Sequence, residues 1–276
     1  MKPVQSRNVR KTQLKSSTAA GRPPFLKIRV LGGDGGIAPG LRTTSFLVND
    51  RILIDAGAAA TALSISRQET IDYVIISHPH IDHVKDLPFM VDNVFGARDK
   101  PMAIVSVPAV VGHIRKHLFN DIIWPDFSRI PTKKNPTIVY KPVKERIKID
   151  DLTIRMYSVN HPCNAVGFIL EDANGAVVIT GDTGPTELIW QKTNATKRLK
   201  AIFTEISFPI EQEAVANISG HFTPKTFREE LRKIHVNVPM FIYHLKPRYN
   251  QTLLNEIHDL KIDSLTVVEQ EDEFIF

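Results

Sequence analysis

The chain has 276 residues, of which 42% are hydrophobic and 24% charged, the composition of a globular protein with a substantial core. No apolar run approaches the ~20 residues of a membrane helix, and the first 24 residues lack the apolar core of a secretory signal, so we expect no membrane association. The single cysteine excludes an internal disulfide and favours a reducing, cytoplasmic location.

The net charge of +5 comes from the start of the chain. Residues 1–24 carry six basic side chains and no acid, which leaves residues 25–276 with a net charge of −1. Residues 1–24 are therefore predicted to be a disordered basic N-terminal tail, with an arm for nucleic acid or a membrane surface as the alternative. Residues 25–276 are predicted to form the folded domain.

In the first half, apolar runs predict strands mixed with short helices. The expected strands are 25–31, 71–77 and 102–107, with a hairpin over 44–57 that turns at Asn49-Asp50, and the expected helices are 61–69, 85–96 and 108–119. A glycine-rich loop, 32–40, follows the first strand and lacks the lysine of a phosphate-binding loop, so it is expected to be a tight loop near the rim of a site.

In the second half, hairpins and strands predominate. The expected strands are 136–143, 152–161, 199–207, 240–245 and 265–276, with a hairpin over 166–182 and a helix over 223–234 that Thr223 caps and Pro224 begins. Hairpins in both halves argue against a single doubly wound parallel sheet. Two sheets stacked inside two layers of helices, an α/β (α+β) sandwich whose halves meet near residue 150, fit the pattern better.

Side chains of the metal-binding kind follow many of these strands. The residues are His78, His80, Asp82 and His83 after 71–77, and later His161, Asp182, Glu205 and His244. A lone histidine at a strand end is often only a hydrogen-bonded polar residue, but four potential ligands in six positions have no structural use. Rigid strand ends make good platforms for a metal site, and histidine with carboxylate and no thiolate suits zinc, with manganese or iron as alternatives.

The spacing of the cluster favours two divalent ions over one. His78 and His80 can face a first ion that His161 completes, whereas Asp82 and His83 can face a second ion that His244 completes. Asp182 would bridge the two. Each ion then keeps an open position, as catalytic sites do, and a pair of ions about 3.5–4 Å apart can hold a bridging hydroxide.

The stretch HPHIDH, residues 78–83, resembles the His-x-His-x-Asp-His motif of the metallo-β-lactamase superfamily. The later landmarks follow in that superfamily's order: His161, TGDTG with Asp182, FTEIS, GHFTP and YHLKP with His244. The resemblance covers residues 25 to about 250. It implies a four-layer αββα sandwich with a dinuclear site at one edge of the inner sheets, and makes 25–276 a metallo-β-lactamase-like hydrolase domain.

Within that superfamily, the motifs GDTGP, TEISFP and GHFTP look most like those of class II 3′,5′-cyclic-nucleotide phosphodiesterases, although Ile81 and Asp86 depart from the class pattern. The resemblance implies hydrolysis of a small nucleotide phosphodiester, cyclic AMP or cyclic GMP, by a metal-bridging hydroxide. It also implies three catalytic roles. Asp82 would orient the hydroxide, His221 would protonate the leaving oxygen, and Glu205 would hold His221 and raise its pKa.

Other activities of the fold remain as alternatives. A tRNA 3′-processing endoribonuclease shares the motif, but the near-neutral charge of residues 25–276 favours a small-molecule nucleotide over RNA as the partner. A lactone or ester hydrolase has less need of Glu205 and His221, and a non-catalytic scaffold would not need every ligand position filled. A homodimer is left open.

Overall fold

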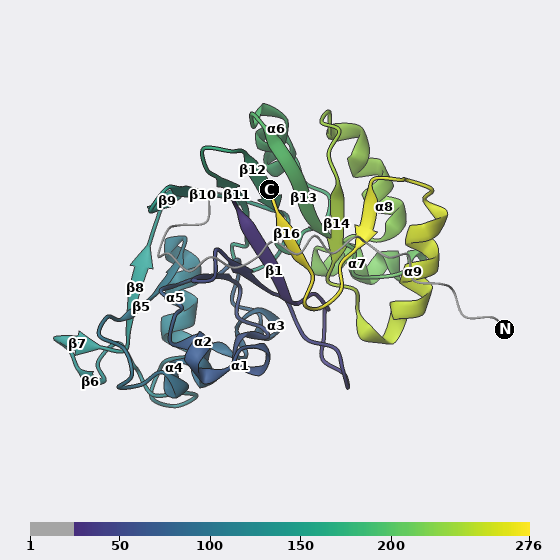
Figure 1. Cartoon of the computed structure of the whole chain (residues 1–276). Helices are drawn as coiled ribbons and strands as arrows, with labels where there is room; N and C mark the ends of the chain where they lie inside the picture. Colours follow the sequence, from purple (N-terminus) through teal and green to yellow (C-terminus); the bar gives the residue numbers. More distant parts are fainter. Residues whose placement is uncertain (1–24) are drawn as a thin grey trace.

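The apolar runs form the strands of two seven-stranded sheets that pack face to face (Figure 1). The computed structural model describes residues 25–276, and the predicted basic tail lies outside this range. The first sheet has the order β16 (Glu273–Ile275), β1 (Lys27–Gly32), β2 (Ser45–Val48), β3 (Ile52–Ile54), β4 (Tyr73–Ile75), β5 (Met102–Ser106) and β8 (Ile138–Pro142). The second has the order β15 (Leu265–Val267), β14 (Met240–Tyr243), β13 (Leu199–Glu205), β12 (Ala176–Ile179), β11 (Val166–Glu171), β10 (Leu152–Ser158) and β9 (Arg146–Ile149).

The two sheets share one pattern of strand directions. In the first, the pairs from β16 to β3 are antiparallel and those from β3 to β8 are parallel. In the second, the pairs from β9 to β12 are antiparallel and those from β12 to β15 are parallel. The chain crosses between the sheets after Pro142, close to the predicted boundary near residue 150.

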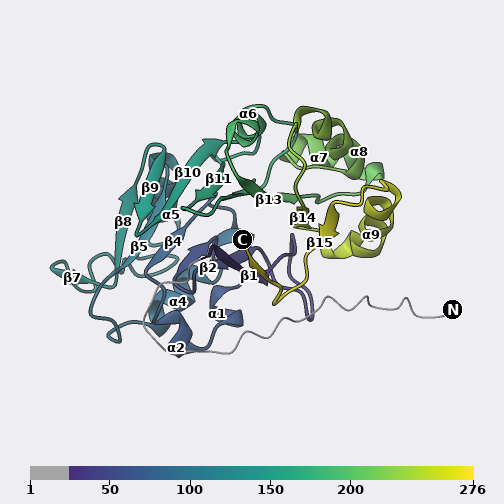
Figure 2. The same cartoon turned by 45° about the horizontal axis from the view of Figure 1, so that its top comes forward.

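Helices cover the outer faces of both sheets (Figure 2). Beside the first sheet lie α1 (Ala59–Ala62), α2 (Ile65–Gln68), α3 (Ile81–Val84), α4 (Leu87–Asn93) and α5 (Pro108–His117). Beside the second lie α6 (Leu188–Ala195), α7 (Glu213–Ser219), α8 (Pro224–Glu230) and α9 (Asn250–Asp259), with short 3-10 turns η1 (Ile210–Gln212), η2 (Leu231–Lys233) and η3 (Pro247–Tyr249). A two-stranded ribbon of β6 (Pro131–Thr132) and β7 (Asn135–Pro136) projects near β8 (Figure 1).

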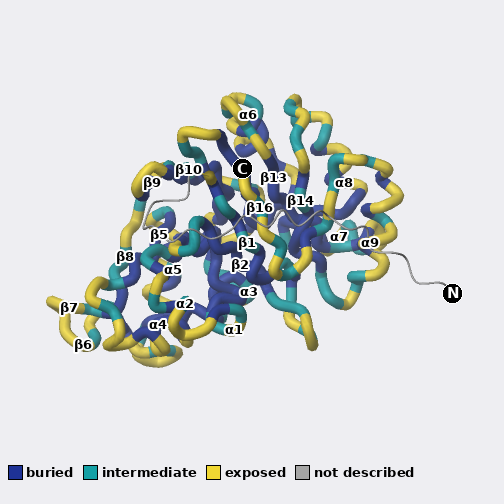
Figure 3. The backbone as a smooth tube through the Cα atoms, viewed as in Figure 1, coloured by how far each residue is buried: buried dark blue, intermediate teal, exposed yellow. Residues whose placement is uncertain are grey.

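Three apolar layers hold this sandwich together. Along β2, Phe46 and Val48 belong to the central core between the sheets, whereas Leu47 belongs to the core beneath the helices. Both faces of the strand are therefore covered, which is why the inner strands are buried, whereas exposed residues lie on helices, loops and edge strands such as β9 and β16 (Figure 3). The observed architecture is the predicted αββα sandwich.

Most predicted elements are present, with local differences. Asn49 and Asp50 turn the β2–β3 hairpin with φ of 48° and 59°, as predicted. The single strand predicted over 265–276 is wrong, because β15 and β16 belong to different sheets. The single helix predicted over 61–69 is two short helices. Among residues 25–276, no helix combines the length and apolarity needed to cross a membrane.

Candidate dinuclear metal centre

The predicted site residues come together where strands of the two sheets end. The segment after β4 supplies His78, His80 and, from α3, Asp82 and His83, while the second sheet supplies His161, Asp182, Glu205 and His244 after or at the ends of β10, β12, β13 and β14. His244 has a left-handed backbone, with φ of 67°, immediately after β14. Such strain in a non-glycine residue persists where the surrounding structure holds it in place, commonly at functional sites.

The first group of potential ligands is His78, His80 and His161. Their ligand nitrogens lie within 4.8 Å of one another, and His161 Nε2 is 3.1 Å from His80 Nδ1. His78 is fully buried and His161 nearly so. This is the trio that the sequence predicts for a first ion.

The second group is Asp82, His83 and His244. His83 Nε2 is 3.3 Å from His244 Nε2, and Asp82 Oδ2 is 3.4 Å from the same His244 nitrogen. Asp182 lies between the two groups, since its Oδ2 is 3.1 Å from both His83 and His244 and 3.9 Å from His78 Nε2. All seven predicted ligands therefore converge, with Asp182 in the bridging place.

Hydrogen bonds behind the histidines orient their ligand nitrogens inward. His83 Nδ1 donates to Asp55 Oδ2 at 2.7 Å, and His161 Nδ1 donates to the Gly220 carbonyl at 2.8 Å. Ser207 gives its hydroxyl proton to Glu205, so it accepts from His244 Nδ1 at 2.9 Å. Each of these contacts fixes a tautomer whose Nε2 carries a lone pair toward the centre.

The pKa values of the buried groups agree with a ligand role. Burial lowers the pKa of His78 well below its ordinary value and that of His161 to about 4, so both are neutral lone-pair donors at pH 7. Burial disfavours charge on His83 as well, but the carboxylates of Asp182 and Asp55 raise its pKa well above the ordinary value. The position between these acids thus favours a cation, which a metal ion can supply in place of the proton.

Among the described residues, five buried side-chain polar atoms have no hydrogen-bond partner, and two of them, His78 Nε2 and Asp182 Oδ1, belong to this centre. An unpartnered buried polar atom is costly unless it has another ligand. Two nitrogens bound to one tetrahedral ion at about 2.0–2.1 Å lie about 3.3 Å apart, close to the 3.1 and 3.3 Å seen in the two groups. The residues present therefore fit two divalent ions.

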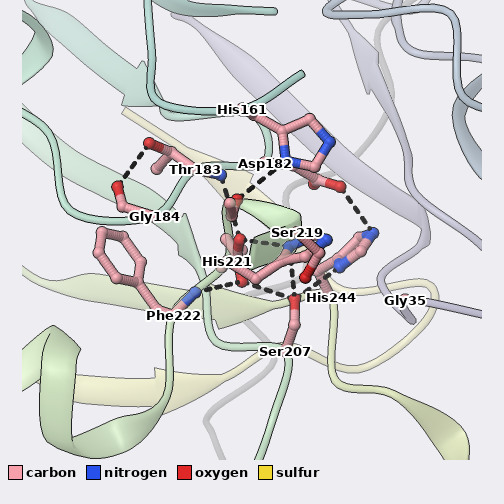
Figure 4. A network of polar contacts seen from close by, with 12 residues as sticks. Gly35, His161, Asp182, Thr183, Gly184, Ser207, Ser219, His221, Phe222 and His244 are labelled. Carbon is pink, nitrogen blue, oxygen red and sulfur yellow. Dashed lines mark hydrogen bonds and ion pairs between the residues drawn. The ribbon is translucent and has the colours of Figure 1, made fainter. Parts of the chain in front are cut away.

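A second network surrounds Glu205, which is fully buried. Figure 4 shows three of the residues in this network, Thr183, Ser207 and His221. Its Oε1 accepts from His221 Nδ1 at 2.7 Å and from the Thr183 amide at 3.1 Å, while its Oε2 accepts from Ser207 at 2.6 Å. The His221 ring lies 4.8 Å from that of His161 and 5.4 Å from that of His244. His221, the predicted proton donor, therefore lies beside both groups of potential metal ligands.

Burial alone would lower the pKa of His221, but the Glu205 carboxylate overcomes this and raises it. His221 immediately precedes Phe222 and the capped start of α8, where Thr223 forms a capping box with Thr226 and Pro224 takes the first turn, as the sequence predicts. The cap and the glutamate together fix the backbone and the side chain of His221.

The model of the beta-lactamase superfamily domain matches residues 50–243, more than half of the chain. The chain belongs to the beta-lactamase superfamily. It is a hydrolase of the metallo-β-lactamase fold, a fold that implies divalent metal ions at the centre described above.

Relatives within the superfamily include nucleotide and RNA hydrolases. The chain is 25% identical over 291 residues to a probable 3′,5′-cyclic-nucleotide phosphodiesterase of Yersinia pestis, covering 85% of this chain and 81% of that one. It is 27% identical over 155 residues to ribonuclease Z of Haloarcula marismortui, covering 53% of this chain and 48% of that one. The crystal structure of unliganded yeast PDE1 superposes with a TM-score of 0.74 at 18% identity, covering 91% of this chain and 99% of that one.

Two residues of this superfamily site were missed by the sequence analysis. Asp55 directly follows β3 and accepts hydrogen bonds from the Ser77 amide, the Ser77 hydroxyl and His83, each at 2.7 Å. Ser207 joins Glu205 to His244. Asp55 carried the same signal as the ligands, a carboxylate directly after an apolar strand, whereas a serine two residues past Glu205 carried none.

Proposed function

We propose that the chain is a dinuclear zinc phosphodiesterase that hydrolyses a small nucleotide phosphodiester, a 3′,5′-cyclic nucleotide. The observation that carries the proposal is the His221–Glu205 pair, a held proton donor beside two metal-ligand groups. A phosphodiester needs protonation of an alkoxide leaving group, and an imidazole beside a buried carboxylate suits that task near neutral pH.

The proposed metal ligands are His78, His80 and His161 for one ion, Asp82, His83 and His244 for the other, and Asp182 for both. Zinc fits these nitrogen and carboxylate donors, and manganese or iron would be the alternative outcomes of metal analysis. When bound, the ions supply Lewis acidity that lowers the pKa of a water molecule and neutralises charge on the phosphate.

The chain's own residues then complete the reaction. Although burial by itself would raise it, contacts with His244 and His83 hold the pKa of Asp82 below its ordinary value, so this carboxylate stays ionised and can orient the attacking water. His221 donates its proton to the leaving oxygen from Nε2, because Nδ1 is engaged by Glu205. Glu205 keeps the ring in place and favours its protonated form.

The substrate is inferred from the named relatives. A phosphodiesterase of cyclic nucleotides is the name carried by the relative with 85% coverage of this chain, whereas the ribonuclease Z relative covers about half. We therefore propose a cyclic nucleotide as the substrate, with a tRNA precursor as the alternative. Consistent with the single cysteine, Cys163, we propose a cytoplasmic enzyme, with a homodimer as a further proposal.

The discriminating experiment combines metal analysis with a substrate panel: bis(p-nitrophenyl) phosphate, cyclic AMP, cyclic GMP, 2′,3′-cyclic nucleotides, a lactone and a tRNA precursor. We expect two metal ions per chain and turnover of a 3′,5′-cyclic nucleotide. Turnover of the tRNA precursor alone, or of the lactone alone, would contradict the proposed substrate class.

Replacing His221 by alanine tests the catalytic assignment. Because His221 is proposed as an acid and not as a ligand, His221→Ala should lower kcat for the cyclic nucleotide by about 10²–10⁴-fold with both metals retained. His258→Ala is the matched control, since that side chain is 89% exposed. Loss of metal from His221→Ala would show that His221 is a ligand.

A further inference from the structure

Lys246 lies two residues beyond His244 and reaches back to the metal centre. Its Nζ donates a hydrogen bond to the Gly35 carbonyl at 2.7 Å and lies 3.8 Å from Asp82 Oδ2. The side chain is 24% exposed, so the ammonium stands at the margin of the buried site and can still meet a substrate. A lysine ammonium has three donors, and the Gly35 carbonyl takes one.

Phe208 connects the ammonium to the proposed acid. Lys246 Nζ lies 5.9 Å from the centre of the Phe208 ring, within the range of a cation–π contact, and the same ring lies 5.6 Å from that of His221. Lys246 therefore stands on the side of the site where Asp82 and His221 both lie. An anion held between these groups would be within reach of its free donors.

The balance of charges in the site indicates a role for the Lys246 ammonium in binding an anion. The site carboxylates are Asp55, Asp82, Asp182 and Glu205, and together they would balance two divalent ions. Lys246 and the protonated His221 are then surplus positive charges, and Lys246 is the one at the margin of the desolvated centre. A bound phosphate anion neutralises it, whereas a neutral ester leaves it uncompensated.

We propose that Lys246 contacts the substrate phosphate and makes the site selective for an anionic phosphodiester over a neutral ester or phosphotriester. The inference rests on the proposed function and names one of its specificity-determining residues. It also explains how this site can differ from a lactone or ester hydrolase that has the same metal ligands.

A purely structural role makes a different prediction. Through Gly35, Lys246 also ties the loop 33–41 to the end of β14, and loosening that loop would impair every substrate alike. Gln270 ties the same loop at its other end, where its Nε2 donates to the Gly40 carbonyl at 2.6 Å. Gln270→Ala is therefore the matched control for loop anchoring without loss of a charge at the site.

The test compares wild type, Lys246→Gln, Lys246→Arg and Gln270→Ala on bis(p-nitrophenyl) phosphate and on its neutral methyl triester. For Lys246→Gln we expect kcat/KM on the diester to fall about 10- to 100-fold, the loss of one hydrogen bond to a charged group, with the triester unchanged. Lys246→Arg should recover most of the diester activity. Equal losses on both substrates, or no loss on the diester, would overturn the proposal.

Binding of inorganic phosphate by the metal-loaded protein, measured by calorimetry, separates this inference from the proposed function. Lys246→Gln should bind phosphate at least about tenfold more weakly than wild type and Gln270→Ala. If wild type hydrolyses no diester, the proposed function fails, while the phosphate measurement still decides the role of Lys246. Equal phosphate affinity in wild type and Lys246→Gln refutes that role.

Discussion

At the scale of single residues, Asp55 shows that residues without a ligand role hold the proposed metal ligands in place. It is 2% exposed, has a left-handed φ of 58°, and joins Ser77 and His83 through three short hydrogen bonds. Ser77 in turn lies 3.0 Å from His78 Nδ1. One carboxylate thus influences a histidine in each of the two proposed metal groups.

Asp55→Asn should weaken metal binding without removing a ligand. An amide offers one acceptor oxygen in place of two. At the position of Oδ2 it would keep the Ser77 hydroxyl and His83 but set its NH2 group against the Ser77 amide, and at the position of Oδ1 it would lose His83. We expect a loss of about 10- to 100-fold in metal affinity, measured by competition with a chromogenic chelator. Asp50→Asn, at the half-exposed hairpin turn, is the control, and equal affinities would contradict the supporting role of Asp55.

Asp34, in the loop beside His244, gives a stability prediction that depends on pH. Burial raises its pKa from 3.8 to about 6, only partly offset by a hydrogen bond from the Arg42 backbone. The folded state therefore binds the proton more tightly than the unfolded state, so stability falls as pH rises from about 4 to 6 and the penalty is complete above about 6.

Asp34→Asn should remove that penalty. A shift of this size corresponds to about 3 kcal/mol, which partial solvent screening at this rim position reduces to about 1–2 kcal/mol. Urea unfolding at pH 7.5 should show this gain, whereas at pH 4 the variant and wild type should have equal stability. A gain of the same size at both pH values would exclude ionisation of Asp34 as the cause.

The seven proposed ligands could be predicted because each follows an apolar strand and four of them lie within six positions. Ser207 could not, since its importance comes from Glu205 and His244 meeting on either side of its hydroxyl. Cys163, two residues past His161, is exposed, with its Sγ 3.7 Å from His80 Nε2. The contacts of Ser207 with His244 and of Cys163 with His80 join residues more than 35 positions apart, so no local sequence pattern indicates them.

At the scale of elements, the glycine-rich loop after β1 packs closely against the second sheet's end. A Cβ at Gly35 would lie 2.4 Å from the His244 carbonyl oxygen and 2.7 Å from His244 Nδ1 (Figure 4 shows both residues). The loop is thus at the rim of the site, as the sequence predicts, and Gly35 permits a close approach of the two backbones.

Gly35→Ala should therefore displace His244. The added methyl group competes for the space of the Nδ1–Ser207 hydrogen bond, so we expect at least about a tenfold loss of metal affinity. Gly36→Ala is the matched control, because its Cβ would meet only the Pro247 side chain, with Cδ at 3.0 Å and Cγ at 3.4 Å. Retention of both metals and of full activity in Gly35→Ala would show that the loop moves to accommodate the methyl group and that His244 keeps its position.

Element boundaries were less predictable than element types. The segment 265–276, predicted as one strand, contains a reversal in which the Glu269 amide donates to Asp272 Oδ2 at 2.8 Å and Glu271 takes φ of 73°. Glutamate is not a typical residue of left-handed turns, so the pattern indicates one strand where the structure has two. The helix α9 was missed, although Leu253 and Ile257 have the spacing of a buried helical face.

At the scale of the whole molecule, the last strand connects the two halves. The chain leaves the second sheet at β15 and returns to pair β16 with β1, so the final residues of the chain belong to the first sheet (Figure 1). Phe274 lies on this strand and faces the space between the sheets. Its ring is 4.3 Å from that of Phe241 and 5.3 Å from that of Phe203, both in the second sheet.

Phe274→Ala should destabilise the entire molecule, because the ring joins the central core that both halves share. We expect a loss of about 2–3 kcal/mol, somewhat below the range for a fully buried phenylalanine since Phe274 is half-buried. The neighbouring Ile275 points to solvent with 63% exposure, so Ile275→Ala should cost less than about 1 kcal/mol while the same strand pairing is kept. In urea unfolding followed by tryptophan fluorescence and by far-ultraviolet circular dichroism, both probes should shift together for Phe274→Ala. Two separate transitions would instead show that the halves unfold independently, and that β16 does not couple them.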